Sequence, residues 1–324
     1  MIRDKGTDNK QIRNREYLNP QVNAQVTVII PTYNRPRLIG RAIKSVLNQI
    51  YQNFEIVVVD DSPNDETEKV VKNFKDNRIK YIRNRTKTNL SKARNQGVKE
   101  SNPKSSYVAF LDDDDKWFPN FLEETIKEFE GKSDLIGVSP FGARRLGDGT
   151  MLPVKRGPVY RFWENGAIGN SWVLKKKLFK EENFWFDEEL SNSEDLDFGI
   201  RVSRNHRVEI MPKILWMCIV LPLSEGESLF TDYKKQAINI DYFFDKHRAT
   251  YAEAGKKALA FLYYFTGKIY CQAGRIKKGR EHLKEALKIN SNLEYLIYYL
   301  TSLICPQIFQ NYRLQFLKHK ILRD

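Results

Sequence analysis

Apolar and polar positions alternate in regular blocks along roughly the first 130 residues. Short apolar runs rich in valine and isoleucine predict buried strands, and each is followed by residues whose apolar positions recur at helical spacing. The predicted strands cover residues 26–30, 55–59, 79–82 and 107–111. The predicted helices cover residues 36–47, 65–76, 91–100 and 119–129. Strands that alternate with helices predict an α/β protein with a doubly wound, mostly parallel sheet flanked by helices.

The pattern changes twice after the last of these helices. Residues 131–225 are irregular, with glycine and proline turns and many aromatic residues, which is typical of a region that shapes a substrate pocket. From about residue 232 the spacing is helical again. We therefore expect a flexible leader over 1–24, an α/β domain over 25–230 and a small helical C-terminal region over 231–324.

Two further patterns lie in the C-terminal region. Residues 260–291 resemble one tetratricopeptide repeat, which needs a neighbour because a single repeat does not bury its own apolar face. The positions that carry this resemblance are Tyr263, Gly267, Tyr270, Gly279, Leu283 and Ala286. Residues 312–323 mix apolar and basic side chains, as in a basic amphipathic helix. Such a helix binds an anionic membrane surface or a partner protein, or it docks on its own protein by its apolar side.

Composition places the chain among globular proteins, since 41% of its 324 residues are hydrophobic and 12% are aromatic. The three cysteines, Cys218, Cys271 and Cys305, lie far apart without metal-binding spacing and fit a reducing compartment. The polar N-terminal stretch lacks the apolar core of a signal peptide, and no stretch reaches the ~20 apolar residues of a transmembrane helix. We expect a cytoplasmic protein, peripheral on the cytoplasmic face of a membrane.

The net charge of +13 is concentrated at the C-terminal end. Residues 246–324 hold 15 Lys and Arg against 5 Asp and Glu, so ten of the thirteen excess positive charges lie there. A sequence pI of about 9.4 raises the question of nucleic-acid binding. The basic stretch carries no recognised nucleic-acid motif, so we expect no nucleic-acid partner.

Four consecutive aspartates, Asp112 to Asp115, directly follow the apolar run 107–111. The carboxyl ends of the strands in an open α/β sheet are where ligands bind. Carboxylates packed this closely repel one another unless a cation or hydrogen-bond donors compensate. The run therefore indicates a divalent metal that holds a diphosphate, or else a solvated acidic turn that caps the next helix.

Polar residues also follow the other predicted strands. Residues 31–35 follow the first strand, and Asp60, Asp61 and Ser62 follow the second. Residues 89–95 add lysine, arginine and asparagine near a helix start, where anions are favoured. Acidic residues at two strand ends can have two different roles. One set can hydrogen-bond a nucleoside, and the other can bind a metal that contacts its phosphates.

Five segments, in this order, resemble the motif series of glycosyltransferase family 2 over roughly residues 25–225. They are Pro-Thr-Tyr-Asn-Arg at 31–35, Val-Val-Val-Asp-Asp-Ser at 57–62, Ala-Arg-Asn at 93–95, Phe-Leu-Asp-Asp-Asp-Asp at 110–115 and Ser-Glu-Asp-Leu-Asp-Phe at 193–198. Each motif alone is weak, whereas the series is specific. The resemblance implies a GT-A fold, a nucleotide-sugar donor, a divalent metal and inversion at the anomeric carbon.

The resemblance also implies roles for single residues on the donor side. The residues that it places at the nucleotide-sugar are Pro31, Thr32, Tyr33, Asn34, Asp60, Asp61, Arg94, Asp112 and Asp113. Asp60 would bind the base or ribose, and Arg94 would lie near the uracil or the diphosphate. Asp114 would bind the metal directly, while Asp112 would reach the ribose or a metal-bound water. A site of oxygen ligands suits Mg²⁺ or Mn²⁺.

On the acceptor side, the resemblance implies that Asp195 is the catalytic base and that Glu194 orients the acceptor. Inverting transfer needs a carboxylate there, because the acceptor hydroxyl loses its proton as it attacks the anomeric carbon. Asp197 would support the helix that follows. The four histidines lie away from every motif, so we expect them to be structural or surface residues.

One more segment resembles the family's lining of the acceptor or sugar pocket. It contains Gly169, Asn170 and Trp172. The alternative is a plain strand in which Trp172 belongs to the core, since buried tryptophan is common. In the first interpretation, Trp172 would stack on a sugar ring.

Together these features predict an inverting, metal-dependent glycosyltransferase whose donor is a UDP-sugar. The acceptor would be a hydroxyl of a glycan, a polysaccharide or a lipid-linked oligosaccharide. One alternative is a sugar-1-phosphate nucleotidyltransferase, but the glycine-rich signature of that class does not follow the first strand. The other is a non-catalytic scaffold on a degenerate transferase fold, which the intact Asp112, Asp114 and Asp195 disfavour.

Overall fold

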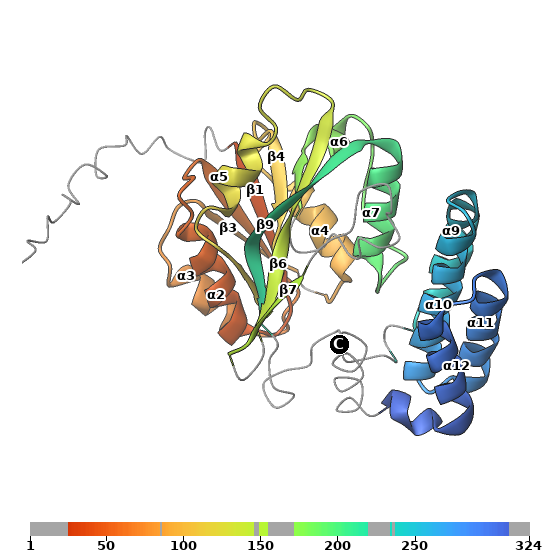
Figure 1. Cartoon of the computed structure of the whole chain (residues 1–324). Helices are drawn as coiled ribbons and strands as arrows, with labels where there is room; N and C mark the ends of the chain where they lie inside the picture. Colours follow the sequence, from red (N-terminus) through yellow and green to blue (C-terminus); the bar gives the residue numbers. More distant parts are fainter. Residues whose placement is uncertain are drawn as a thin grey trace, which may run out of the picture.

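The computed structural model describes residues 25–84, 86–145, 149–154, 172–219, 234 and 237–310. Figure 1 shows a twisted sheet with helices on both faces and a group of helices beside it. The strands are β1 (Val26–Thr32), β2 (Phe54–Asp60), β3 (Ile79–Arg83), β4 (Tyr107–Phe110), β5 (Asp115–Trp117), β6 (Leu135–Arg145), β7 (Met151–Val154), β8 (Val173–Lys175) and β9 (Arg207–Ile219). The predicted leader over 1–24 and the basic tail over 312–323 lie outside the described residues.

Helices connect and cover the strands. Those of the sheet domain are α2 (Pro36–Leu47), α3 (Glu66–Lys72), α4 (Leu90–Lys99), α5 (Phe121–Lys127), α6 (Lys177–Lys180) and α7 (Glu194–Asn205). Those of the C-terminal group are α9 (Ile240–Glu253), α10 (Lys256–Gln272), α11 (Ile276–Ile289), α12 (Leu293–Ile304) and the 3₁₀ helix η3 (Pro306–Gln310). The predicted α/β class with a helical C-terminal region is therefore confirmed.

Within the described residues, the strands form one sheet in the order β3-β2-β1-β4-β8-β6-β9-β5, with β7 paired to β6. The first four strands in this order are parallel, as the alternating pattern predicts. Beyond β4 the sheet is mixed, because β8 runs antiparallel to both β4 and β6, and β9 runs antiparallel to β5. The fold is thus an α/β domain with a mixed sheet whose N-terminal half is parallel.

The mixed half comes from the stretch that is irregular in sequence. Strand β6 contains Gly137 and Gly142, which lie under tryptophan rings. A Cβ on Gly137 would come within 2.9 Å of the Trp172 ring, and one on Gly142 within 2.2 Å of the Trp216 ring. Glycine at these positions makes room for large side chains but removes the alternating pattern by which a strand is predicted.

Two apolar layers hold the helices on the sheet. Alternate residues of β1 point to opposite faces, so Val28 and Ile30 belong to one core cluster and Ile29 to the other. Helices α2 and α5 pack on the first face, and α4 and α7 pack on the second (Figure 1). Both faces are buried, which is why the parallel strands appear in the sequence as continuous apolar runs.

The C-terminal helices pack against α7 through apolar side chains. Leu196 and Ile200 of α7 share an apolar cluster with Ile240, Phe243 and Phe244 of α9. Farther along the chain, α10 and α11 form a helix-turn-helix at the position of the predicted repeat. The helical pair is confirmed, and its membership of the tetratricopeptide family stays a prediction.

The close crossing of α10 and α11 depends on glycine. A Cβ on Gly267 would lie 2.8 Å from the backbone oxygen of Gly279 and 3.0 Å from the backbone nitrogen of Leu283. We expect Gly267→Ala to lower the free energy of unfolding by about 1 to 2 kcal/mol, because overpacking outweighs the roughly 1 kcal/mol gained in helix propensity. Chemical denaturation measures this change.

Gly40 in α2 provides the matched control. A Cβ there would meet Val70 at 3.5 Å, an ordinary contact, so Gly40→Ala should stabilise the protein slightly. Equal effects of the two substitutions would contradict the role of glycine in the α10–α11 crossing.

Candidate active site

The carboxyl ends of three parallel strands meet at one edge of the sheet. Strand β1 pairs with β2 on one side and with β4 on the other, and Thr32 is in register with Asp60. Asp112 follows β4 by one residue beyond Leu111. The structure therefore brings together the motifs that follow the first, second and fourth strands, as expected for a ligand site in such a sheet.

Three of the four aspartates form a cluster. Single carboxylate oxygens of Asp112, Asp114 and Asp115 lie within 4.8 Å of one another. Asp115 begins β5, so the acidic turn leads into a strand rather than into a helix. Helix capping, the alternative explanation of this run, therefore does not account for the four acids.

The electrostatics of this cluster favour a cation. Burial, and then the charge of Asp112, raises the pKa of the Asp114 carboxyl above its ordinary value. Burial, and then Asp114, raises the pKa of Asp115 well above its ordinary value. A divalent ion would relieve this repulsion, and an all-oxygen donor set of this kind fits Mg²⁺ or Mn²⁺. The residues present thus fit the metal that the resemblance implies.

Asp113 points to different partners from its neighbours. Its carboxylate accepts hydrogen bonds from Thr32 Oγ1 at 2.7 Å and from Arg35 Nη1 at 2.9 Å. The same Arg35 nitrogen lies 3.1 Å from Asp114 Oδ2. Burial raises the pKa of Asp113 to about 7, and Arg35 opposes that rise. Asp113 and Thr32 therefore fix the turn, and Arg35 joins it to the acidic cluster.

Sequence reasoning missed two arginines beside the cluster. Arg35 belongs to the first motif, yet only the fold reveals that it bridges two aspartates. Arg41 of α2 lowers the pKa of Asp114 by its charge, and its Nε and Nη2 are buried without a hydrogen-bond partner among the described residues. Guanidinium groups beside a candidate cation site suit the oxygens of a diphosphate. The helical spacing of α2 carried no signal for this role.

Arg94 connects the acidic cluster to the predicted base. It lies on α4 and is 1% exposed. Its Nη2 donates to Asp112 Oδ1 at 2.9 Å, and its Nη1 donates to Glu194 Oε1 at 2.7 Å. Although burial opposes its charge, Asp112 and Glu194 hold the pKa of Arg94 above its ordinary value. One buried guanidinium therefore positions both acidic motifs.

Asp195 lies next to this bridge, in the first turn of α7. Its side chain is partly buried, and its Oδ1 accepts the Leu196 backbone N–H at 2.7 Å. Burial, and then the charge of Glu194, raises the pKa of Asp195 to about 7. A carboxyl with this pKa can accept a proton near neutral pH, as a general base must.

Asp60 and Asp61 are held by internal donors. Asp60 is fully buried, and it accepts the Ser62 N–H at 2.8 Å and the Tyr81 hydroxyl at 2.6 Å. Asp61 accepts hydrogen bonds from Asn84 Nδ2 at 2.6 Å and from the Thr88 hydroxyl at 2.6 Å. These bonds order the loops around the strand ends. The predicted contact of Asp60 with a nucleoside stays a prediction.

The residues after Thr32 form an open surface. Pro31 is still in β1, whereas Tyr33 is 41% exposed, with Lys87 Nζ 3.9 Å from its ring centre. Asn34 has a φ of 53°, and its N–H donates to Ser62 Oγ at 2.7 Å. An exposed aromatic ring beside a lysine can stack on a base and attract a phosphate.

The predicted sugar-pocket segment is only partly described. Gly169 and Asn170 lie outside the described residues. Trp172 is 3% exposed and belongs to the core cluster on the α4–α7 face of the sheet. Its burial agrees with the core interpretation, and stacking of its ring on a sugar stays a prediction.

Asp197 anchors the other side of α7 to the C-terminal helices. It is fully buried, and its carboxylate contacts Lys246 Nζ at 2.7 Å, His247 Nε2 at 2.9 Å and Arg201 Nη2 at 2.7 Å. Although burial opposes its charge, the bond from His247 and the charge of Arg201 hold the pKa of Asp197 well below its ordinary value. Since α7 carries Asp195 in the same turn, α9 stabilises the helix that carries the predicted base.

This anchor gives a prediction about His247. His247→Ala leaves the buried Asp197 with fewer hydrogen bonds, so we expect the free energy of unfolding to fall by about 1 to 3 kcal/mol. Transfer should also slow while the affinity for the nucleotide stays unchanged, because α7 and not the donor site is loosened. Denaturation curves and steady-state kinetics measure the two effects.

Arg204 offers a control on the same interface. It pairs with Glu253 at 2.5 Å, but both side chains are exposed, so Arg204→Ala should cost well under 1 kcal/mol. If both variants behaved alike, the buried bond to His247 would have no special role.

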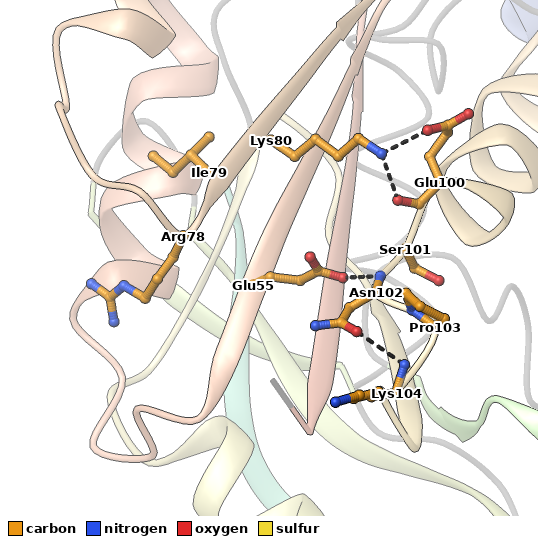
Figure 2. A pocket seen from close by; sticks show the side chains of 9 residues that line it. All are labelled: Glu55, Arg78, Ile79, Lys80, Glu100, Ser101, Asn102, Pro103 and Lys104. Atoms are coloured by element: carbon orange, nitrogen blue, oxygen red, sulfur yellow. Dashed lines mark hydrogen bonds and ion pairs between the residues drawn. The ribbon is translucent and has the colours of Figure 1, made fainter. Parts of the chain in front are cut away.

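A separate cavity lies at the opposite edge of the sheet. It measures about 590 Å³ and adjoins the amino-terminal ends of β2 and β3 (Figure 2). Its acids are engaged internally, since Glu55 accepts the Asn102 N–H and Glu100 pairs with Lys80 at 2.6 Å. Ligands in this class of sheet bind at the carboxyl ends instead, so this cavity is not the candidate active site.

Comparison with known proteins agrees with the site. The family described as "Glycosyl transferase family 2" matches residues 27–190. WcaA of Escherichia coli (strain K12), a glycosyl transferase named for colanic acid biosynthesis, is 30% identical over 258 residues, which cover 75% of this chain and 88% of that protein. The chain therefore belongs to glycosyltransferase family 2 and is a glycosyltransferase.

Two further similarities concern a shorter segment and the fold. The Escherichia coli UDP-Glc:alpha-D-GlcNAc-diphosphoundecaprenol beta-1,3-glucosyltransferase WfgD is 41% identical over 101 residues, 31% of this chain and 39% of that protein. The structure of the mannosyltransferase PcManGT from Pyrobaculum calidifontis, in complex with GDP-Man and Mn²⁺, aligns with a TM-score of 0.57 at 17% identity. That alignment covers 92% of this chain and 84% of the other, and it supports the GT-A fold.

Proposed function

We propose that this glycosyltransferase moves a hexose with inversion from a UDP-sugar to a hydroxyl of a lipid-linked or polysaccharide glycan. The observation that carries the proposal is the Arg94 bridge between Asp112 and Glu194. It links the acidic cluster to Glu194, the residue next to Asp195, whose carboxyl has a raised pKa. Donor activation and acceptor deprotonation need those two groups close together.

On the donor side, the chain supplies charges of both signs. Asp112, Asp114 and Asp115 would hold Mn²⁺ or Mg²⁺, which when bound neutralises charge on the leaving diphosphate. Arg35 and Arg41 lie beside this cluster and would hydrogen-bond the same phosphate oxygens. A preorganised positive environment of this kind favours the charge that develops as the glycosidic bond breaks.

On the acceptor side, Asp195 is the group that would take the hydroxyl proton. In an inverting transfer, the acceptor oxygen attacks the face of the anomeric carbon opposite to the departing diphosphate. Glu194, which Arg94 holds by a hydrogen bond, raises the pKa of Asp195 by its charge. The donor and acceptor names of WfgD, a UDP-glucose and a diphosphoundecaprenol-linked sugar, support a UDP-sugar and a lipid-linked acceptor for this chain too.

The test of this proposal is product analysis. The full chain would be incubated with a UDP-hexose labelled in the sugar, Mn²⁺ and an undecaprenyl-diphosphate-linked N-acetylhexosamine. Label that appears in the lipid-linked product, with release of UDP, supports the proposal. Release of pyrophosphate from UTP and a sugar 1-phosphate would instead establish the nucleotidyltransferase alternative.

The raised pKa of Asp195 gives a pH prediction. Because only the ionised carboxylate accepts a proton, kcat/KM should fall about tenfold per pH unit below about 7 and level off above it. Glu194→Gln removes a negative charge that raises this pKa, so its acid limb should lie at lower pH. An acid limb that stays in place in the variant would contradict this coupling.

A further inference from the structure

The helix α12 is mostly apolar, and only one side of it is buried against its neighbours. Tyr295 and Ser302 are buried on the side that faces α10 and α11. The opposite side carries five large aliphatic residues with exposed fractions between 40% and 81%. They are Leu293, Leu296, Leu300, Leu303 and Ile304.

This set, called here the α12 outer face, follows helical spacing. At 100° per residue the five side chains fall within about one third of the helix circumference. A contiguous exposed apolar face of this kind marks an interaction surface in a soluble domain. In the described part of the chain, no helix is both long enough and apolar enough to cross a membrane.

The helical region that contains α12 is positively charged overall, although the one charged residue of α12 itself is the exposed Glu294. Residues 256–310 contain nine Lys and Arg against three Asp and Glu. Arg280 of α11 attaches to α12 by donating to the Ser302 carbonyl at 2.7 Å. The exposed Lys277 and Lys284 lie one turn before and one turn after Arg280 on the same side of α11.

We propose that the α12 outer face docks into the interfacial layer of an anionic lipid bilayer, with the lysines of α11 on the headgroups. A helix that lies in this layer buries its apolar side about 5 to 10 Å deep, which a single helix face can do. Basic residues beside the apolar side add attraction to anionic lipid. The choice of a bilayer as the occupant rests on the apolar face and on the net positive charge of residues 256–310.

A second copy of the chain fits this surface less well. Each copy carries a net charge of +13, so two such ends repel each other. A twelve-residue helix is roughly 18 Å long and 10 Å wide, whereas a stable interface buries about 800 Å² per partner. An anionic bilayer has the complementary charge and needs no larger contact.

The surface has a consequence for the reaction, which rests on the proposed function. A lipid-linked acceptor has its lipid in the bilayer, so a docked enzyme meets it by diffusion in two dimensions. Vesicle binding itself requires neither donor nor metal. A failure to bind vesicles is therefore distinguishable from a failure to transfer sugar.

The test is sedimentation of the full chain with vesicles of phosphatidylglycerol and phosphatidylcholine, or of phosphatidylcholine alone. We expect binding to the anionic vesicles, and at least a tenfold loss of affinity in Leu296→Gln/Leu300→Gln, in which glutamine keeps helix propensity. Lys277→Gln/Lys284→Gln should weaken binding to anionic vesicles and reduce its salt dependence.

Ile50→Gln/Ile214→Gln is the matched control, since these side chains are 49% and 45% exposed on the sheet domain, and it should bind as the unchanged chain does. Absence of binding to anionic vesicles would overturn the proposal. So would full binding by Leu296→Gln/Leu300→Gln, which would assign the contact to another part of the chain. If light scattering showed that the unchanged chain is a dimer and that Leu296→Gln/Leu300→Gln is a monomer, a second copy of the chain would be the occupant instead.

Discussion

Replacing Asp195 with asparagine is expected to lower the transfer rate by roughly 10³-fold while the affinity for the nucleotide donor stays within about twofold. General-base catalysis contributes about 10² to 10⁴ in rate, and asparagine keeps the size of the side chain but accepts no proton. The Arg94 bridge uses Glu194 and Asp112, so it survives this substitution. Single-turnover transfer and equilibrium nucleotide binding measure the two quantities separately.

Asp134→Asn is the control for this prediction. Asp134 pairs with Arg207 in an exposed salt bridge on the sheet domain, so its loss should leave both rate and affinity unchanged. Normal turnover by Asp195→Asn would remove the base assignment. A parallel loss of nucleotide affinity would instead show that Asp195 belongs to the donor site.

Asp114→Asn is expected to weaken binding of the nucleotide donor rather than to slow proton transfer. We expect the affinity for UDP in Mn²⁺ to fall by roughly 100-fold or more, since even residues behind a metal ligand change metal affinity 10- to 100-fold. Without metal, the variant should be at least as stable as the unchanged chain, because one of the repelling carboxylates is neutral. Calorimetric titration measures the UDP affinity, and thermal unfolding in EDTA measures the stability without metal.

This prediction is specific because UDP affinity is expected to fall while stability without metal does not. A substitution that only damaged the fold would lower stability and affinity together. Unchanged UDP affinity in Mn²⁺ would contradict the cation site. A UDP affinity that EDTA leaves intact in the unchanged chain would contradict it as well.

Part of the site could be predicted from the sequence because it depends on strand ends. A buried parallel strand is a continuous apolar run, so the residues that follow β1, β2 and β4 are identified by position alone. The register of Thr32 with Asp60 then follows from the pairing of neighbouring strands. The acidic cluster at Asp112 and Asp114 was predictable for the same reason.

The rest of the site depends on contacts between distant segments. Arg94 and Glu194 are 100 residues apart, and no local pattern signals their bond. The four aspartates look alike in sequence, yet Asp113 turns toward Thr32 and Arg35 while Asp115 joins the cluster. Which carboxylates share a site is decided by the turn between β4 and β5, which tertiary packing sets.

In the C-terminal helices, too, some features could be predicted from the sequence and others could not. Their helical spacing and the small residues Gly267 and Gly279 could be recognised in the sequence, and the close crossing confirms their packing role. The buried contacts of Asp197 with Lys246 and His247 could not be recognised, because each residue has an ordinary helical setting. Only the docking of α9 on α7 shows that these residues stabilise the helix that carries the proposed base.

The most direct measurement is thermal unfolding of the full chain with UDP, GDP, dTDP or CMP, each in Mn²⁺, Mg²⁺ or EDTA. Binding to the folded state at 100 times Kd stabilises it by about 2.7 kcal/mol, which unfolding readily detects. The structure predicts that UDP with Mn²⁺ raises the midpoint and that EDTA abolishes the shift. No shift with any nucleotide, or a shift that EDTA leaves unchanged, would contradict a metal-dependent nucleotide-sugar site at the ends of β1, β2 and β4.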